Sequence, residues 1–154
     1  MPLLESSYSI VVPAKNEAER LEQFIPGLVA AHPEAEIFVV NDGSEDDTAE
    51  VAKRCGTLEL SHPYSKSNGA AIKTGARAAS NTNLLFMDGD GQHQMQDVAP
   101  LLEKLERGYE LVVGARREGK SHINIWRDGI PFLLIIFKID TLYSPPSSSC
   151  LSLC

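Results

Sequence analysis

Cysteines, aromatic residues and long apolar runs are all scarce in this sequence of 154 residues. Three cysteines without framework spacing exclude a disulfide scaffold and favour a reducing compartment. The most apolar run, residues 130–139, contains a proline and a lysine and is shorter than the roughly 20 residues that cross a bilayer. We therefore expect no transmembrane span, and a protein that is cytoplasmic or lies peripherally at the cytoplasmic face of a membrane.

Positive charge is also in short supply, because 14 Lys and Arg stand against 21 Asp and Glu, for a net charge of -7. Such a chain is a poor binder of nucleic-acid backbones, so we expect no nucleic-acid partner. A phosphorylated small molecule would have to be held by a metal cation or by a local basic residue. The 43% hydrophobic content is that of a globular protein, and the length suits one core.

Short apolar runs alternate with helical stretches from Tyr8 to Gly114, which predicts strands joined by crossover helices and a mainly parallel α/β sheet. We expect Asn16 to cap the first helix and Pro26 to kink it or end it early. The predicted strands cover residues 8–12, 36–40, 57–60, 84–87 and 111–113, and the later helices cover 48–54, 69–80 and 97–107.

The regular alternation ceases after Arg117, and the chain ends in a Ser/Pro-rich stretch. We therefore divide the sequence into a ligand-binding domain, residues 1–117, and a non-matching tail, residues 118–154, part of which we expect to be disordered.

Polar segments follow four of the predicted strands, where the carboxyl ends of parallel strands form a ligand-binding rim. After residues 84–87, Asp88 and Asp90 can share a hard cation, Mg²⁺ or Mn²⁺, although an Asp-Gly surface turn is the alternative. His93 is better explained as a hydrated loop residue than as a ligand. Asp42 could accept a hydrogen bond from a base, or it could cap the next helix, which is favoured in isolation.

Two further segments have competing interpretations. Arg116 could grip a diphosphate or be an ordinary surface arginine. Residues 69–75 contain Lys-Thr, yet Ile72 stands where a phosphate loop needs glycine, so we expect a helix that packs closely through small residues.

Together these segments resemble family 2 glycosyltransferases, in the branch of dolichyl-phosphate mannose synthases and polyprenyl-phosphate glycosyltransferases. The resemblance spans residues 6–117. It implies a GT-A fold, which is a Rossmann-like three-layer α/β/α arrangement with an incomplete C-terminal part here, a nucleotide-sugar donor and a divalent cation. The motifs that carry it are Val11-Val12-Pro13-Ala14-Lys15-Asn16-Glu17, Val40-Asn41-Asp42-Gly43-Ser44, Asn68-Gly69-Ala70-Ala71, Asp88-Gly89-Asp90-Gly91-Gln92-His93 and Val113-Gly114-Ala115-Arg116.

The resemblance also implies roles for single residues. The nucleoside pocket would be lined by Pro13, Lys15, Glu17, Val40 and Asp42, with Asp42 on the base. The diphosphate and cation would be held by Asp88, Gly89, Asp90 and Gln92, of which Asp88, Asp90 and Gln92 are the metal ligands. Arg116 would contact phosphate and, with Asp90, serve catalysis. Lys15 and Asn41 depart from the residues usual in the family, so both UDP-glucose and GDP-mannose stay open as donors.

The resemblance favours a polyprenyl or dolichyl phosphate as acceptor, which is already an anion and needs no general base. Because the family pattern is not found after Arg117, we expect a truncated donor-binding half that transfers sugar poorly or not at all. Two alternatives stay open: a haloacid-dehalogenase-like phosphohydrolase, whose nucleophile loop also reads Asp-x-Asp-Gly, and a non-catalytic nucleotide-binding domain.

Overall fold

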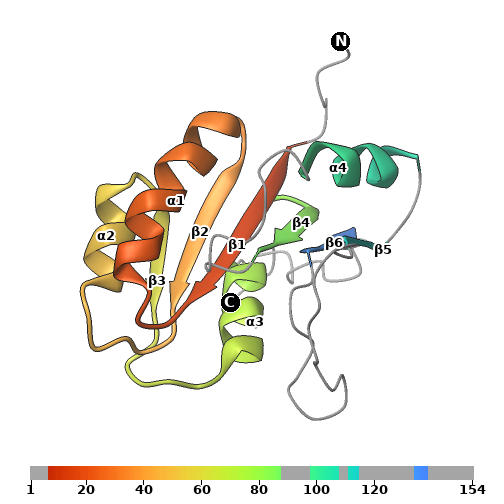
Figure 1. The fold of residues 1–154 in the computed structure, drawn as a ribbon. Helices are drawn as coiled ribbons and strands as arrows, with labels where there is room; N and C mark the ends of the chain where they lie inside the picture. Colours follow the sequence, from red (N-terminus) through yellow and green to blue (C-terminus); the bar gives the residue numbers. More distant parts are fainter. Residues whose placement is uncertain (1–6, 88–97, 108–110, 115–133, 139–154) are drawn as a thin grey trace, which may run out of the picture.

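Among the residues that the structure describes, 7–87, 98–107, 111–114 and 134–138, six strands form one sheet with helices on both faces (Figure 1). The coordinates are a computed structural model. They confirm the predicted α/β class. The strands are β1 (Tyr8–Ala14), β2 (Glu36–Asn41), β3 (Leu58–Ser61), β4 (Asn83–Phe86), β5 (Leu111–Gly114) and β6 (Leu134–Lys138). The helices are α1 (Ala18–Ala31), α2 (Thr48–Arg54), α3 (Asn68–Ala78) and α4 (Val98–Glu106).

The strand order is β3-β2-β1-β4-β6-β5, and β1 pairs in parallel with β2 on one side and β4 on the other. The chain runs outward from β1 to β3 and then returns to β4. Strand order therefore reverses between β1 and β4, and in open parallel sheets ligands bind beyond the carboxyl ends of the strands at this point. The carboxyl end of β1 is thus where a site is expected.

The strand β6 lies between β4 and β5 and is antiparallel to both. No strand was predicted for residues 134–138. Their pairing with β4 and β5 shows that residues 134–138 contribute a strand to the interior of the sheet.

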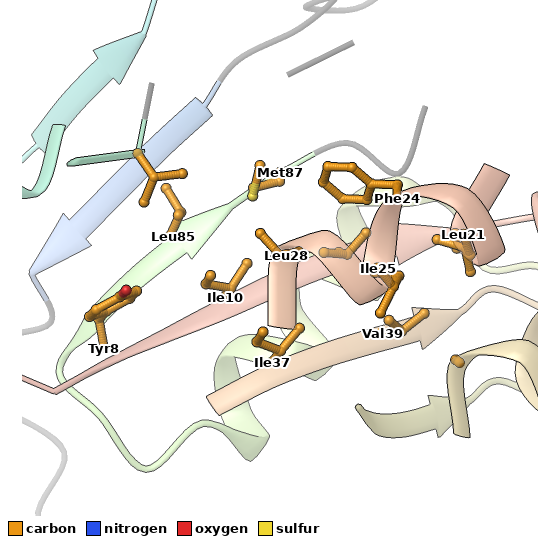
Figure 2. Packing of buried hydrophobic residues seen from close by; sticks show 14 of the residues in the cluster. Tyr8, Ile10, Leu21, Phe24, Ile25, Leu28, Ile37, Val39, Leu85 and Met87 are labelled. Carbon is orange, nitrogen blue, oxygen red and sulfur yellow. The ribbon is translucent and has the colours of Figure 1, made fainter. Parts of the chain in front are cut away.

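The larger core lies on the face covered by α1, α2 and α4 (Figures 1 and 2). Side chains alternate along a strand, so Ile10 and Val12 of β1 enter this core while Val11 faces the other side. Figure 2 shows side chains of α1 packed over those of β1 and β2. Among the residues labelled there, Leu21, Phe24, Ile25 and Leu28 belong to the helix, and Ile10, Ile37 and Val39 belong to these strands.

The helix α3 covers the opposite face, and it is the closely packed helix that the small-residue pattern predicted. A Cβ atom on Gly75 would overlap the side chain of Val11, so glycine is what lets this helix approach β1. Ala71 of the same helix is also buried. Residues 69–75 are therefore part of a helix and not a phosphate loop.

A kink or an early end was expected at Pro26, and the early end is wrong, because α1 continues through Pro26 to Ala31. Burial of four apolar side chains, at about 1.5–3 kcal/mol each, outweighs the cost of about 3 kcal/mol for an interior proline. Asn16 does not cap the helix either, because it has φ 54° and the N-cap position belongs to Glu17.

None of the helices within the described ranges is long and apolar enough to span a bilayer.

Candidate functional site

A hollow of about 260 Å³ opens at the carboxyl ends of β1 and β2. Four of the residues that line it were predicted from the sequence: Pro13, Lys15, Glu17 and Asp42. The opposite wall comes from Ser65 and Ser67 of residues 62–67, here called the rim loop, and from Asn68 at the start of α3. The structure therefore brings the segments after β1 and β2 together around one cavity.

The other predicted site residues are not part of this hollow. Val40 is fully buried in the core beneath α3, beside Phe38 and Ala71. Outside the described residues lie Asp88, Gly89, Asp90, Gln92, His93 and Arg116. The segment that contains Asp88 begins just past β4, which neighbours β1 in the sheet.

Side-chain hydrogen bonds join the loops after β1 and β2. The Asn16 N–H donates to Ser44 Oγ at 2.9 Å, and the Glu45 N–H donates to Asn16 Oδ1 at 2.9 Å. The buried Asn41 side chain adds two bonds, since its Oδ1 accepts from the Ser44 N–H and its Nδ2 donates to Ser61 Oγ. The position that departs from the family pattern, Asn41, thus has a structural role here.

The first turn of α1 is capped from another loop. The Ala18 N–H donates to Asp46 Oδ2 at 3.1 Å, and the Glu17 N–H donates to Thr48 Oγ1 at 3.0 Å. Burial alone would raise the pKa of Asp46, but hydrogen bonds from Thr48 and Ala18 outweigh it and lower the pKa below its ordinary value. A negative charge at this helix N-terminus is also favoured by the helix dipole.

The carboxylate of Asp42 is the acceptor at the centre of the rim loop. Its Oδ1 accepts from His62 Nδ1 at 2.7 Å and from the Lys66 N–H at 2.8 Å. Its Oδ2 accepts from Ser65 Oγ at 2.8 Å and from the Ser67 N–H at 3.0 Å. None of these donors belongs to α2, so the helix-cap interpretation of Asp42 is wrong.

These four donors keep Asp42 ionised. Burial raises its pKa, but the hydrogen bond from His62 and those from Lys66, Ser65 and Ser67 act in the opposite direction and hold the pKa well below its usual range. Asp42 is 5% exposed, so the charge is stabilised almost wholly by the protein.

A further residue of this network, His62, was not predicted from the sequence; it is 7% exposed. Its Nδ1 lies 2.7 Å from Asp42, and its Nε2 lies 2.8 Å from Thr74 Oγ1 on α3. One signal could have found it: His62 directly follows β3, so topology places it on the same rim as Asp42. A single histidine inside a loop forms no pattern of residue types, and it was missed for that reason.

The chemistry of the hollow is polar and of mixed charge. Lys15 and Asn68 are exposed at its walls, and Glu17 is half-buried. Within the described ranges, no three His, Cys, Asp or Glu side chains gather as a metal site. The two carboxylates and the amide oxygen predicted as ligands after β4 are the oxygen donors that Mg²⁺ and Mn²⁺ prefer.

Known proteins share both the sequence and the fold. The chain is 36% identical over 110 residues to an uncharacterised glycosyltransferase of Mycobacterium bovis, covering 71% of this chain and 48% of that protein. It is 29% identical over 126 residues to the polyprenol monophosphomannose synthase of Mycolicibacterium smegmatis, covering 76% and 48%. The chain thus spans about half the length of these relatives.

A solved structure with the same fold is glucosyl-3-phosphoglycerate synthase from Mycobacterium tuberculosis in complex with Mn²⁺, UDP and phosphoglyceric acid. It matches with a TM-score of 0.64 and 26% identity, over 75% of this chain and 45% of that one. This likeness confirms the GT-A fold that the sequence predicted.

The sequence model for glycosyl transferase family 2 matches residues 9–151. The match extends past Arg117, beyond the last motif that was found in the sequence. It also sets aside the phosphohydrolase alternative, whose nucleophile loop shares only the Asp-x-Asp-Gly motif. With the GT-A sheet and a hollow lined by residues of two family motifs, the chain belongs to glycosyl transferase family 2.

Proposed function

We propose that the hollow beyond β1 and β2 binds the nucleoside part of a nucleotide-sugar donor of the UDP-glucose or GDP-mannose type. The observation that carries this proposal is the convergence of Pro13, Lys15, Glu17 and Asp42 on one cavity. These residues come from two separate family motifs, and they meet at the crevice where parallel sheets bind ligands. The complex of glucosyl-3-phosphoglycerate synthase with Mn²⁺ and UDP supports a nucleotide in a related protein.

The diphosphate would extend from the hollow toward the segment after β4. In this proposal Asp88, Asp90 and Gln92 hold a divalent cation, Mg²⁺ or Mn²⁺, with Gly89 beside the diphosphate and Arg116 on a phosphate oxygen. The cation would supply stabilisation of the negative charge on the departing nucleoside diphosphate. The planar, positively charged guanidinium of Arg116 would bind the same phosphates.

The proposed reaction transfers a hexose to a polyprenyl or dolichyl phosphate. The similarity to the polyprenol monophosphomannose synthase supports this acceptor class. The attacking group would be a phosphate oxygen, which is already ionised, so none of the chain's side chains is needed to remove a proton. An acceptor of this kind places the protein peripherally at the cytoplasmic face of a membrane.

Thermal-shift measurements with UDP-glucose and GDP-mannose, each with and without Mn²⁺, test donor binding. We expect a rise in Tm that needs the cation and that is lost in Asp90→Asn. The matched control is Asp47→Asn, since Asp47 is exposed and makes no side-chain cap bond. A rise of equal size in the Asp90→Asn protein would remove that residue from the site, and no rise with either donor would refute the proposal.

Transfer itself needs a separate assay, because the chain spans about half of its relatives. Labelled hexose would be followed from the donor into polyprenyl phosphate. Because the chain spans about half the length of its relatives, we expect it to bind the donor with little or no turnover. Sustained turnover would refute the expected loss of transfer, whereas binding without any transfer or hydrolysis would favour a non-catalytic nucleotide-binding domain.

A further inference from the structure

The rim loop connects β3 to α3 and is built to hold one position. A Cβ atom on Gly43, which has φ 66°, would lie 2.5 Å from the backbone nitrogen of Ser65. The loop after β2 and the rim loop therefore touch through their backbones. Such contact leaves no space for the rim loop to move closer to the loop after β2.

The carboxylate of Asp42 accepts hydrogen bonds from several groups of the rim loop. All four donors to Asp42 belong to this loop, and two of them are backbone N–H groups. An ionised carboxylate offers about four lone-pair sites, so the present bonds fill it. A base N–H could reach Asp42 only after one of these donors had left.

The rim loop also contains a strained residue. Ser67 has φ 115°, a region that side chains other than glycine rarely adopt and that costs about 1–3 kcal/mol. Its N–H is held by Asp42 Oδ2, and its own Oγ accepts from the Ala70 N–H at the start of α3. Since Ser67 lines the hollow, the contacts that maintain this strained backbone also maintain the wall of the hollow.

The imidazole of His62 ties this arrangement to a rigid element. An ionised carboxylate only accepts, so His62 Nδ1 carries the hydrogen and donates it to Asp42. In the neutral imidazole the other nitrogen, Nε2, accepts from the Thr74 hydroxyl, at 2.8 Å. Thr74 lies in α3, which packs tightly on β1 through Gly75.

We propose that His62 is a positioning residue of the donor site: by bridging Asp42 and Thr74 it fixes the rim loop as a preformed wall of the hollow before a nucleotide binds. This inference rests on the proposed donor site but assigns His62 no contact with the donor. The row of carboxylate, imidazole and hydroxyl is not a nucleophile triad, because Thr74 lies within α3 and does not line the hollow.

Two measurements on the whole chain test this role. Titration calorimetry with UDP and with GDP, each in the presence of Mn²⁺, gives the Kd. Limited trypsin digestion gives the rate of cleavage after Lys66, which is exposed in the rim loop while its N–H is held by Asp42. If His62→Ala leaves the wall formed about a tenth of the time, the Kd rises about tenfold. Cleavage after Lys66 follows the open fraction instead, so it should accelerate by about tenfold or more.

Milder variants keep the test valid where His62→Ala does not fold. His62→Asn places an amide N–H where Nδ1–H stood, so we expect both the Kd and the cleavage rate to recover most of the way. Thr74→Val removes only the outer bond and is expected to fall between wild type and His62→Ala. The matched control is His32→Ala, which removes another buried histidine far from the hollow and should lower Tm without changing the Kd.

The outcomes separate the two proposals. Wild-type Kd and wild-type cleavage in His62→Ala, or an equal rise of Kd in His32→Ala, would overturn the role of His62. Faster cleavage with an unchanged Kd would show that the loop is fixed but that binding does not depend on it, which also overturns the positioning role. If wild type binds neither nucleotide, the proposed function fails and with it any role in donor binding, while the cleavage rates still decide whether His62 fixes the loop.

Discussion

Two buried histidines occupy opposite ends of the sheet, and the fold satisfies them differently. His62, at the carboxyl end, has both ring nitrogens hydrogen bonded. His32 lies at the end of α1, near the start of β1. Its Nδ1 is hydrogen bonded to the Tyr8 hydroxyl at 2.7 Å, while its Nε2 has no partner among the described residues. The histidine with two hydrogen-bonded ring nitrogens therefore lies beside the hollow, and the one with an unpartnered nitrogen lies at the opposite end of the sheet.

The electrostatics of the two ends differ in the same way. The carboxyl end is organised around the ionised carboxylate of Asp42. At the amino end burial dominates: it lowers the pKa of His32 against the opposing charge of Glu34, and it raises the pKa of Tyr8 together with the Glu34 hydrogen bond and charge. The amino end is thus built from neutral rings, which tolerate a missing partner more cheaply than a buried charge does.

The substitution Asp42→Ala should produce the largest effect, because it leaves the His62 imidazole and two backbone N–H groups without their acceptor. We expect a loss of about 3–5 kcal/mol in the free energy of unfolding, measured by urea denaturation. The control Asp47→Ala removes an exposed carboxylate and should change stability by about 0.5 kcal/mol or less. Losses of similar size in both variants would contradict a special role for the carboxyl end.

At the amino end, Tyr8→Phe should cost about 1 kcal/mol, since it removes the hydroxyl that bonds His32 and Glu34 while keeping the ring in the core. Urea denaturation again gives the value. Tyr64→Phe serves as the control, because Tyr64 is 66% exposed. A Tyr8→Phe loss as large as that of Asp42→Ala would erase the difference between the two ends.

The smallest expected effect is on the pH dependence of stability, because the histidine at the amino end of the sheet and the carboxylate at the carboxyl end act in different pH ranges. The folded-state pKa of His32 is lowered, so the unfolded chain takes up a proton first as pH falls through about 6.5, and stability declines below that pH. The lowered pKa of Asp42 also makes stability decline as pH falls, but only below about 3.9, where the unfolded carboxylate begins to take up a proton. Between pH 7.5 and 5, wild type should lose more stability than His32→Gln; equal slopes would refute the assignment.

Much of the fold could be predicted because periodicity reports which side chains are buried. The alternation that placed strands at residues 36–40 and 84–87 reflects real burial on both faces of the sheet. Local rules failed where tertiary contacts override them. Pro26 stays inside α1 because burial of the apolar face of that helix stabilises it more than the proline destabilises it. The strand β6 was missed because its pairing depends on β4 and β5, which are distant in sequence.

The site residues that lie at or just after the carboxyl ends of strands could be predicted from the sequence. Pro13, Lys15, Glu17 and Asp42 were expected together, and they line one hollow. What the sequence could not show is how Asp42 is used, because its donors come from the rim loop, where no periodic pattern marks the fold of the backbone. His62 was missed for the same reason.

The position of β6 has a consequence for synthesis on the ribosome. The edge strand β5 pairs with β6, and residues 115–133 must be translated before that partner emerges. At about 5–20 residues per second, β5 waits roughly 1–5 s for its neighbour. During this interval the nascent chain presents unpaired strand edges, at β5 and at the flank of β4, to other chains. Chaperone binding during those seconds would shield these edges from other chains.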